Sequence, residues 1–390
     1  MTFRRNHDAW IVYMIDTGDL GNKKSIAQRS QNMAAVHSDE NYMQRCFDLA
    51  RQGAGFVSPN PMVGAVLVYQ HRIIGEGFHQ AYGKAHAEVN AVNAVSSADR
   101  RLLSQSTLYV SLEPCCIFGR TPPCTNLILE HQIPKVVISC LDQTPGVSGQ
   151  GVDALKAGGV DVTVGVLEEQ GRRLAQIRNT FVTENRPYVM VKFAQTAQGI
   201  FAPNPPRQQW ITGPYTRRLV HRWRQQTDAI LVGATTAMID DPALTNRYFR
   251  GDQPLRIIVD PAGKVPVDCR VFQDGGATML MVRKKKDGDY PDTVEQYEIN
   301  WTEPWIPQLF AILAQKNITH LTVEGGASIL NQFLQQNHWD EARVFTGTAE
   351  IEAGISAPVI PQARKEEYQI GQDTLRVYQY RQRSVKQGLK

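Results

Sequence analysis

The chain has 390 residues, of which 42% are hydrophobic and 21% are charged; these are ordinary globular values, and the length favours two domains. Its 42 basic and 38 acidic residues leave a net charge of +4, which is too balanced to support binding to nucleic acid or to a membrane surface. There is no run of about 18 apolar residues, so we expect no transmembrane helix.

Residues 1–40 precede the first regular pattern, and we expect a disordered N-terminal extension there or the product of an upstream start codon. The apolar run at 10–15 is too short for a secretory signal, and Asp16 and Asp19 follow it closely. We therefore expect a cytoplasmic protein. Its six cysteines are then better explained as metal ligands or free thiols than as disulfides.

Over residues 41–185 the hydrophobic pattern alternates between helix and strand. It predicts a helix over 40–53, a strand hairpin over 63–79 with its turn at 70–72, and a helix from about Ala85. A strand, a helix and a strand are predicted over 106–115, 122–133 and 134–142, and then a helix, a strand and a helix. This order is typical of an α/β domain whose sheet is covered by helices.

A second α/β domain is expected over residues 186–390, because an apolar strand starts afresh after Pro187. Its further strands are predicted over 228–233, 254–260, 277–282, 318–326 and 341–347.

His86 and Glu88 stand near the start of a predicted helix, and Cys115 and Cys124 bracket eight residues after a predicted strand. A hydrolytic zinc site needs three protein ligands, which His86, Cys115 and Cys124 supply, and an open fourth position for water. It also needs a base that does not bind the metal, which is the role expected of Glu88. Cys116 competes as a ligand, but in an extended segment its side chain points away from that of Cys115. The other cysteines are expected to be core thiols: Cys46, Cys140 and Cys269.

Five motifs in this half resemble the zinc deaminases of riboflavin biosynthesis: NPMVGAVLV, IIGEGFH, HAEVNA, LEPC and GRTPPC. The resemblance implies a cytidine-deaminase-like three-layer α/β/α fold and a small phosphorylated pyrimidine substrate, 2,5-diamino-6-(5-phosphoribosylamino)pyrimidin-4(3H)-one. It implies that Glu88 protonates the leaving ammonia, that Asn60 and His79 contact the substrate, and that Arg120 holds phosphate or a base oxygen. Ile117 departs from the family, which usually has histidine there, and isoleucine donates no hydrogen bond.

The second half resembles the reductase domain of the same bifunctional family, through VKFAQTAQGIFA, QQWIT, PLRIIVD and VEGGASIL. This implies a dihydrofolate-reductase-like α/β fold, NADPH as cofactor, reduction of the ribosyl side chain to 5-amino-6-(5-phosphoribitylamino)uracil, and a homo-oligomer formed through this domain. Gly325 and Gly326 stand between a predicted strand and a helix that begins near Ala327. Such a turn allows close approach of a cofactor phosphate. It is not G-x-G-x-x-G, so a Rossmann domain is disfavoured.

The same resemblance assigns roles position by position. NADPH-contacting residues are expected at Ala194, Trp210, Thr236, Asp240, Gly325, Gly326 and Ala327. Substrate-contacting residues are expected at Arg224, Leu244, Arg247 and Glu324, with the two arginines on the ribose phosphate. Lys192 is expected in or near the site. Gln198 and Gln208 stand where the family usually has aspartate and serine.

We therefore expect a bifunctional enzyme: a zinc deaminase followed by an NADPH reductase. One alternative is a deaminase whose second half is structural or binds nucleotide without turnover. Another is a binding protein with a structural zinc, which would need a fourth ligand such as Cys116. Deamination of a polynucleotide base conflicts with the balanced charge and the absence of an aromatic, basic groove.

Overall fold

The computed structural model describes residues 38–119, 122–286, 290–361 and 363–380. They form two compact units that divide between Arg186 and Pro187, one residue beyond the expected boundary. Of the expected extension, residues 1–37 lie outside the described residues, and Asp39 already belongs to the first helix. Within the described ranges, no helix is long and apolar enough to cross a membrane.

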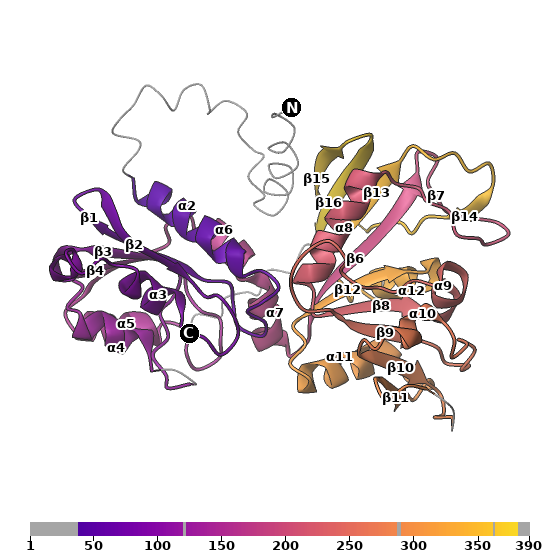
Figure 1. Cartoon of the computed structure of the whole chain (residues 1–390), viewed down its shortest axis with the longest axis horizontal. Helices are drawn as coiled ribbons and strands as arrows, with labels where there is room; N and C mark the ends of the chain where they lie inside the picture. Colours follow the sequence, from indigo (N-terminus) through magenta and orange to yellow (C-terminus); the bar gives the residue numbers. More distant parts are fainter. Residues whose placement is uncertain (1–37, 120–121, 287–289, 362, 381–390) are drawn as a thin grey trace, which may run out of the picture. The chain divides into compact units, whose positions relative to one another are not determined.

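The first unit has a five-stranded sheet in the order β2-β1-β3-β4-β5, with helices on both faces (Figure 1). Strand β1 pairs antiparallel with β2 and β3, whereas β3, β4 and β5 run parallel. In chain order its elements are α2 (Asp39–Ala50), η3 (Arg51–Gly53), β1 (Gly64–Tyr69), β2 (Arg72–Phe78), α3 (Ala87–Asn93), η4 (Arg100–Gln105), β3 (Thr107–Leu112), α4 (Cys124–Glu130), β4 (Lys135–Cys140), α5 (Gln150–Ala157), β5 (Asp161–Val164), α6 (Glu168–Leu174) and α7 (Gln176–Glu184).

Successive residues of its central strands pack on opposite sides of the sheet. In β1, Ala65 and Leu67 join a core with residues of α3, α4 and α5, whereas Val66 and Val68 join a core with residues of α2. Because side chains alternate across a strand, burial on both sides requires an unbroken apolar run. The three-layer α/β/α fold expected for this half is confirmed.

Two local features of this unit follow from its residue types. Ser38 caps α2, since its hydroxyl accepts a hydrogen bond from the Asn41 amide at 3.3 Å. The turn between β1 and β2 is Gln70–His71, both with positive φ, which is the geometry that joins tight hairpins.

The second unit is built on a nine-stranded sheet in the order β11-β10-β9-β8-β12-β6-β13-β16-β15. All neighbours are parallel except at β16 and β15, and β7 and β14 form a separate antiparallel pair. Its elements are β6 (Tyr188–Thr196), β7 (Ile200–Pro203), α8 (Pro214–Gln226), β8 (Ala229–Gly233), α9 (Ala234–Asp240), β9 (Leu255–Val259), α10 (Arg270–Gln273), β10 (Thr278–Val282), β11 (Val294–Glu298), α11 (Trp305–Gln315), β12 (His320–Gly325), α12 (Ala327–Gln335), β13 (Glu341–Gly347), β14 (Gly354–Ser356), β15 (Ala363–Ile370) and β16 (Asp373–Tyr380).

Helices cover both faces of this sheet as well. Residues of α11 and α12 pack on one face with Val189, Leu231 and Val323, whereas α8 packs on the other face beside Met190. The α/β fold expected for this half is confirmed. The predicted strands over 228–233, 254–260, 277–282, 318–326 and 341–347 correspond to β8, β9, β10, β12 and β13.

Parallel strands place their carboxyl ends at one edge of a sheet, where open α/β sheets usually bind ligands. Cys115 follows the carboxyl end of β3, and Asp142 follows that of the neighbouring strand β4. In the second unit, Gly233 and Glu324 lie at the carboxyl ends of β8 and β12, and Lys192 lies in the middle of the neighbouring strand β6.

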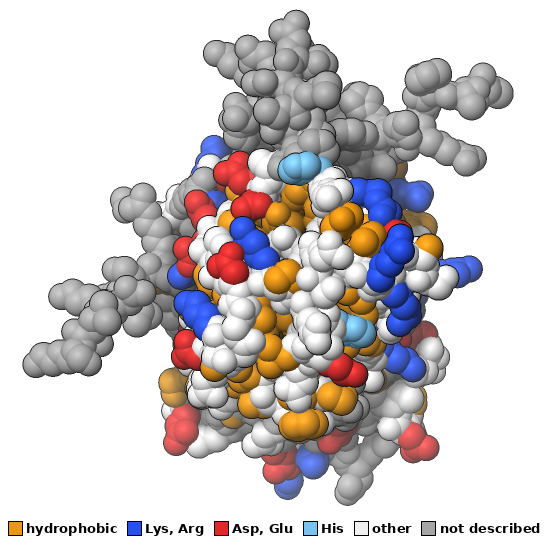
Figure 2. All heavy atoms as spheres, turned by 90° about the vertical axis from the view of Figure 1, so that its left-hand side faces the viewer, with side chains coloured by type: hydrophobic (Ala, Val, Ile, Leu, Met, Phe, Trp, Pro, Cys, Tyr) orange, Lys and Arg blue, Asp and Glu red, His pale blue; other side chains and the backbone are white. Residues whose placement is uncertain are grey.

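One face of the molecule carries both signs of charge around hydrophobic and uncharged side chains (Figure 2).

Candidate active sites

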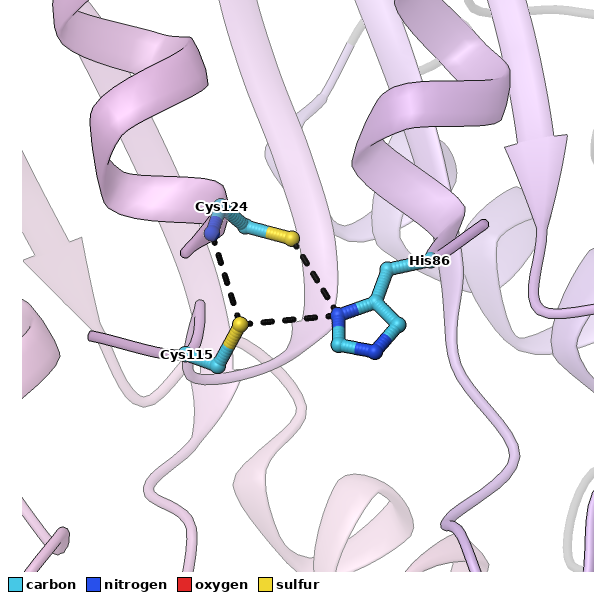
Figure 3. A group of neighbouring side chains, drawn as sticks. All are labelled: His86, Cys115 and Cys124. Carbon is cyan, nitrogen blue, oxygen red and sulfur yellow. Dashed lines mark hydrogen bonds between the residues drawn. The ribbon is translucent and has the colours of Figure 1, made fainter. Parts of the chain in front are cut away.

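Three side chains from different elements of the first unit meet at the carboxyl edge of its sheet (Figure 3). His86 is the N-cap of α3, Cys115 lies in the loop after β3, and Cys124 is the first residue of α4. The Nδ1 atom of His86 lies 3.5 Å from Cys115 Sγ and 3.3 Å from Cys124 Sγ. The Cys124 amide donates to Cys115 Sγ at 3.3 Å, which fixes one cysteine to the other.

This donor set fits zinc. In a tetrahedral site, bonds of about 2.0–2.3 Å place a nitrogen and a sulfur ligand about 3.6 Å apart, close to the distances seen here. Three protein ligands leave the fourth position open, as hydrolytic zinc sites require. The hydrogen bond with Cys124 lowers the pKa of Cys115, which favours the thiolate that binds metals. Cys116 does not belong to this cluster of the described residues.

Glu88 is the second residue of α3, and its side chain is buried. Burial raises the pKa of this carboxyl to about 7. A carboxyl that titrates near neutral pH can both accept and donate a proton. It lines the same pocket as His86 and Cys115, whose cavity volume is about 340 Å³.

Asn60 and His79 form one wall of this pocket. His79 Nδ1 donates to the Ala85 carbonyl at 3.0 Å, which leaves Nε2 to accept from Asn60 Nδ2 at 3.1 Å. The ring of His79 meets that of His86 edge-on, with centroids 5.4 Å apart. The structure thus brings both expected substrate contacts beside the metal ligands. Arg120 lies outside the described residues.

In the second unit, three charged side chains meet at the carboxyl end of β12. Glu324 accepts two hydrogen bonds from Arg224, at 3.1 and 2.8 Å, and lies 3.8 Å from Lys192 Nζ. The sheet register explains the second contact, because Val323 pairs with Val191 and the next residues are Glu324 and Lys192. Burial acts to raise the pKa of Glu324, but Arg224 and Lys192 outweigh it and lower the pKa to about 2.

Arg247 lies against His221 of α8. Its amide and its Nη2 approach His221 Nδ1 and Nε2 at 3.3 and 3.2 Å. Burial, together with the charges of Arg224 and Arg247, lowers the pKa of His221 to about 4, so this imidazole is neutral at pH 7. Leu244 is only 2% exposed and packs in the core, so the structure shows no accessible side chain at this expected substrate contact.

The Gly325–Gly326 turn lies beside α9. A Cβ at Gly326 would sit 3.1 Å from Thr236 Oγ1, and one at Gly325 would sit 3.6 Å from the same atom. Ala327 starts α12 immediately after the turn, and its helix N-terminus suits an anion. A turn without side chains at the start of a nine-residue helix fits the phosphate of a nucleotide cofactor.

The remaining expected cofactor contacts are Asp240, Trp210 and Ala194. Asp240 ends α9, and burial raises the pKa of its carboxyl. Trp210 is 59% exposed, with the Arg217 guanidinium 4.9 Å from its ring centroid. Ala194 lies in β6 and packs against the Met190 core.

Comparison with known proteins identifies both units. The zinc-binding region of cytidine and deoxycytidylate deaminases matches residues 36–140, and the RibD C-terminal domain matches residues 187–349. The riboflavin biosynthesis protein RibD of Aquifex aeolicus is 38% identical over 325 residues, which span 82% of this chain and 89% of that protein. The chain belongs to the RibD family.

Solved RibD structures agree in fold. The Thermotoga maritima diaminohydroxyphosphoribosylaminopyrimidine deaminase/5-amino-6-(5-phosphoribosylamino)uracil reductase is 34% identical and matches with a TM-score of 0.81 over 88% of this chain and 99% of that one. Acinetobacter baumannii RibD is 31% identical, with a TM-score of 0.78 over 87% and 98% of the two chains. The chain is accordingly a bifunctional RibD enzyme, a zinc-dependent deaminase joined to an NADPH-dependent reductase.

Three residues depart from the pattern expected for this family, and the structure places them in three different environments. Ile117 lines the deaminase pocket and is 53% exposed. Gln208 donates through Nε2 to the Asp240 carbonyl oxygen at 3.2 Å, so it holds the end of α9. Gln198 is exposed in the turn between β6 and β7.

Sequence reasoning missed two residues of these RibD sites. Glu113 is buried and accepts hydrogen bonds from the amides of Asp142, Gly149, Gly151 and Val152, at 2.9 to 3.2 Å. Its position directly before the Pro114–Cys115 segment was the available signal. His221 was also missed, although it precedes the expected substrate contact Arg224 by three residues and so shares its face of α8.

Proposed function

We propose that this enzyme removes ammonia hydrolytically from 2,5-diamino-6-(5-phosphoribosylamino)pyrimidin-4(3H)-one and then reduces the ribosyl side chain of the product to give 5-amino-6-(5-phosphoribitylamino)uracil. One observation carries the proposal: two ligands of the three-residue metal cluster, His86 and Cys115, line a single pocket together with the buried carboxyl of Glu88. The activities in the name of the Thermotoga maritima neighbour support the same pair of reactions.

In the deaminase pocket, His86, Cys115 and Cys124 hold the zinc ion. Zinc, when bound, lowers the pKa of a water molecule and so makes a nucleophile available at neutral pH. Glu88 takes a proton from the attacking water and delivers it to the departing amino group, which leaves as ammonia. Asn60 and His79 orient the pyrimidine ring, since their mutual hydrogen bond fixes the direction of both side chains.

In the reductase unit, the Gly325–Gly326 turn and Ala327 bind the NADPH phosphate. Thr236 and Asp240 lie on the adjoining helix, and Trp210 and Ala194 complete the expected cofactor contacts. NADPH supplies the hydride for the opened sugar.

The same unit holds the sugar phosphate through Arg224 and Arg247. Arg224 is fixed by its two hydrogen bonds to Glu324, so its guanidinium is oriented before the substrate arrives.

The first test is zinc content together with ammonia release from the phosphorylated diaminopyrimidinone, for wild type and Glu88→Gln. We expect both proteins to bind zinc, and we expect the variant to lose about 100-fold or more in rate, the range for general acid–base groups. Zinc binding without ammonia release from wild type would refute the proposed substrate. Equal rates for the two proteins would refute the role of Glu88.

We also propose a cytoplasmic location, supported by six cysteines that form no disulfide, as expected in a reducing compartment. A homo-oligomer formed through residues 186–390 stays a prediction. Light scattering of the full chain and of that segment tests it.

A further inference from the structure

Arg178 of α7 is a half-buried cation that the reaction described above does not use. Within the described part of the chain, its side chain donates one hydrogen bond, from Nη1 to the Pro59 carbonyl oxygen at 3.4 Å. Among the described residues it has no ion-pair partner within 4.0 Å. Burial lowers the pKa of Arg178, whereas the more distant Asp142 raises it. Since burying a charge without a partner is unfavourable, its retention here calls for a ligand.

Arg178 lines the same pocket as Glu88 and two of the metal ligands, His86 and Cys115. Apart from the histidines, the cations among the described lining residues are Lys84 and Arg178. Lys84 is exposed, whereas Arg178 is half-buried. A contact with an anion is stronger where water is largely excluded, so Arg178 is the better placed of the two.

The acids that line the pocket leave Arg178 available. Glu113 is occupied by its four amide donors. Asp142 accepts from the Thr144 amide at 2.8 Å. Glu88 is assigned to proton transfer. An anionic group on the substrate therefore meets a guanidinium most of whose five N–H donors have no partner among the described residues.

The position of Arg178 suits the part of the substrate farthest from the metal. Its hydrogen bond to Pro59 places it beside Asn60, whose amide contacts His79, whose ring in turn meets that of His86. The chain of contacts runs from the metal cluster across the base-contacting wall to Arg178. A guanidinium fork matches phosphate oxygens in pairs.

We propose that Arg178 binds the phosphate group of the deaminase substrate and thereby gives this domain its preference for phosphorylated over unphosphorylated pyrimidine ribosides. This inference rests on the proposed function of the pocket. It names a specificity-determining residue for the first reaction only.

The competing explanation is that Arg178 only fixes the turn at Pro59 and Asn60. The two explanations differ in one measurable respect. A phosphate ligand affects only substrates that carry phosphate, whereas a turn that loses its support affects both substrates alike.

The experiment measures ammonia release by the full chain on the phosphorylated diaminopyrimidinone riboside and on its dephosphorylated form. The proteins are wild type, Arg178→Gln, Arg178→Lys, Lys84→Met and the control Arg172→Gln, which removes an exposed arginine paired with Glu168 on α6. For Arg178→Gln we expect kcat/KM on the phosphorylated substrate to fall about 10- to 100-fold, mostly through KM. On the dephosphorylated substrate we expect a change below about threefold, and Arg178→Lys should fall in between.

Equal losses on the two substrates, or no loss, would overturn the proposal. So would a loss confined to Lys84→Met, because the phosphate is then held at the exposed rim. Zinc content and circular dichroism of each variant separate misfolding from lost binding. If Arg178→Gln does not fold, Arg178→Lys decides, because its charge is retained and the phosphate-specific loss should then be partial.

If wild type releases no ammonia from either compound, the proposed function fails on its own. Calorimetric titration with the phosphorylated compound then decides the inference about Arg178. At least fivefold weaker binding by Arg178→Gln than by wild type supports it, and equal binding refutes it.

Discussion

Glu324 shows how one buried side chain sets the state of its neighbours. Its carboxylate accepts hydrogen bonds from the guanidinium of Arg224 and lies near the ammonium of Lys192. Its pKa of about 2 keeps it charged at neutral pH. The partners come from α8 and β6, far apart in the chain. Sequence motifs place each residue in the reductase site, but the pairing itself depends on sheet register and could not be predicted.

This pairing predicts a pH-dependent difference between wild type and Glu324→Gln. A carboxyl whose pKa falls from 4.5 to about 2 on folding stabilises the fold above about pH 4.5 by about 3 kcal/mol. That contribution is lost as the pH falls through 2. We expect the variant to be less stable at pH 7 and the gap to narrow between pH 4.5 and 2. Urea unfolding at a series of pH values measures the free energy of unfolding of both proteins. A stability difference between them that does not change with pH would contradict the prediction.

A second prediction concerns which cysteines bind zinc. Cys115→Ser should lose zinc affinity by more than about 100-fold, because it removes a ligand. Cys116→Ser, one residue further along, should keep the metal, because its thiol lies outside the ligand cluster. Zinc content after dialysis measures both. Loss of zinc from Cys116→Ser would indicate a closed, structural site instead of an open one.

At the scale of elements, close contact between α5 and the Pro114–Cys115 segment shapes the deaminase site. A Cβ at Gly151 would lie 2.2 Å from the Pro114 carbonyl oxygen, which is a backbone atom that cannot turn aside. The helix therefore reaches the ligand loop only because this residue has no side chain. Glu113 holds the same two segments together, because its carboxylate accepts hydrogen bonds from the amides of Gly151 and Val152 at the start of α5.

Gly151→Ala should accordingly destabilise the first unit. Alanine favours a helix by up to about 1 kcal/mol over glycine, but overpacking typically costs about 1–3 kcal/mol, so the clash should dominate. Gly119→Ala is the matched control, since nothing lies within 4 Å of its Cβ position, and it should change stability by less than about 0.5 kcal/mol. Thermal unfolding compares wild type, Gly151→Ala and Gly119→Ala. If Gly151→Ala were more stable than wild type, α5 and the Pro114–Cys115 segment could move apart at little cost, which would contradict the prediction.

The elements themselves were predictable where apolar runs are long. Strands β1, β3, β4, β8, β9 and β10 each have apolar residues on both faces, and each was expected. Strands β15 and β16 were not expected. Charged residues such as Glu366 and Arg376 interrupt the alternation of apolar and polar residues along these two strands. Such residues are common at the edge of a sheet, but they weaken the sequence pattern that predicts a strand.

At the scale of the whole molecule, the chain divides into two units with separate sheets and separate cores. The motifs indicated both activities and the approximate division. They could not show how side chains distant in sequence meet within each unit, such as Arg178 with Pro59. Those contacts depend on how loops cross the ends of the strands.

Separate cores predict that the two activities survive separation of the units. The segment 38–186 should bind zinc and release ammonia. The segment 187–390 should oxidise NADPH in the presence of the deaminated riboside phosphate, with no dependence on zinc. Rates of each segment within about threefold of the full chain would be expected for independent domains. A reductase segment that is folded but inactive would favour a second half that only binds nucleotide.

The four hydrogen bonds that Glu113 accepts from backbone amides affect how the enzyme acquires its metal. They tie the Cys115 segment to the chain around Asp142 and α5 without any help from an ion. The ligand cluster is then assembled as the chain folds, unlike small zinc domains that fold only on metal capture. Loading of the apoenzyme should produce little change in heat capacity. A newly made chain can thus persist as a folded apoenzyme, with its deaminase activity limited by zinc supply and not by refolding.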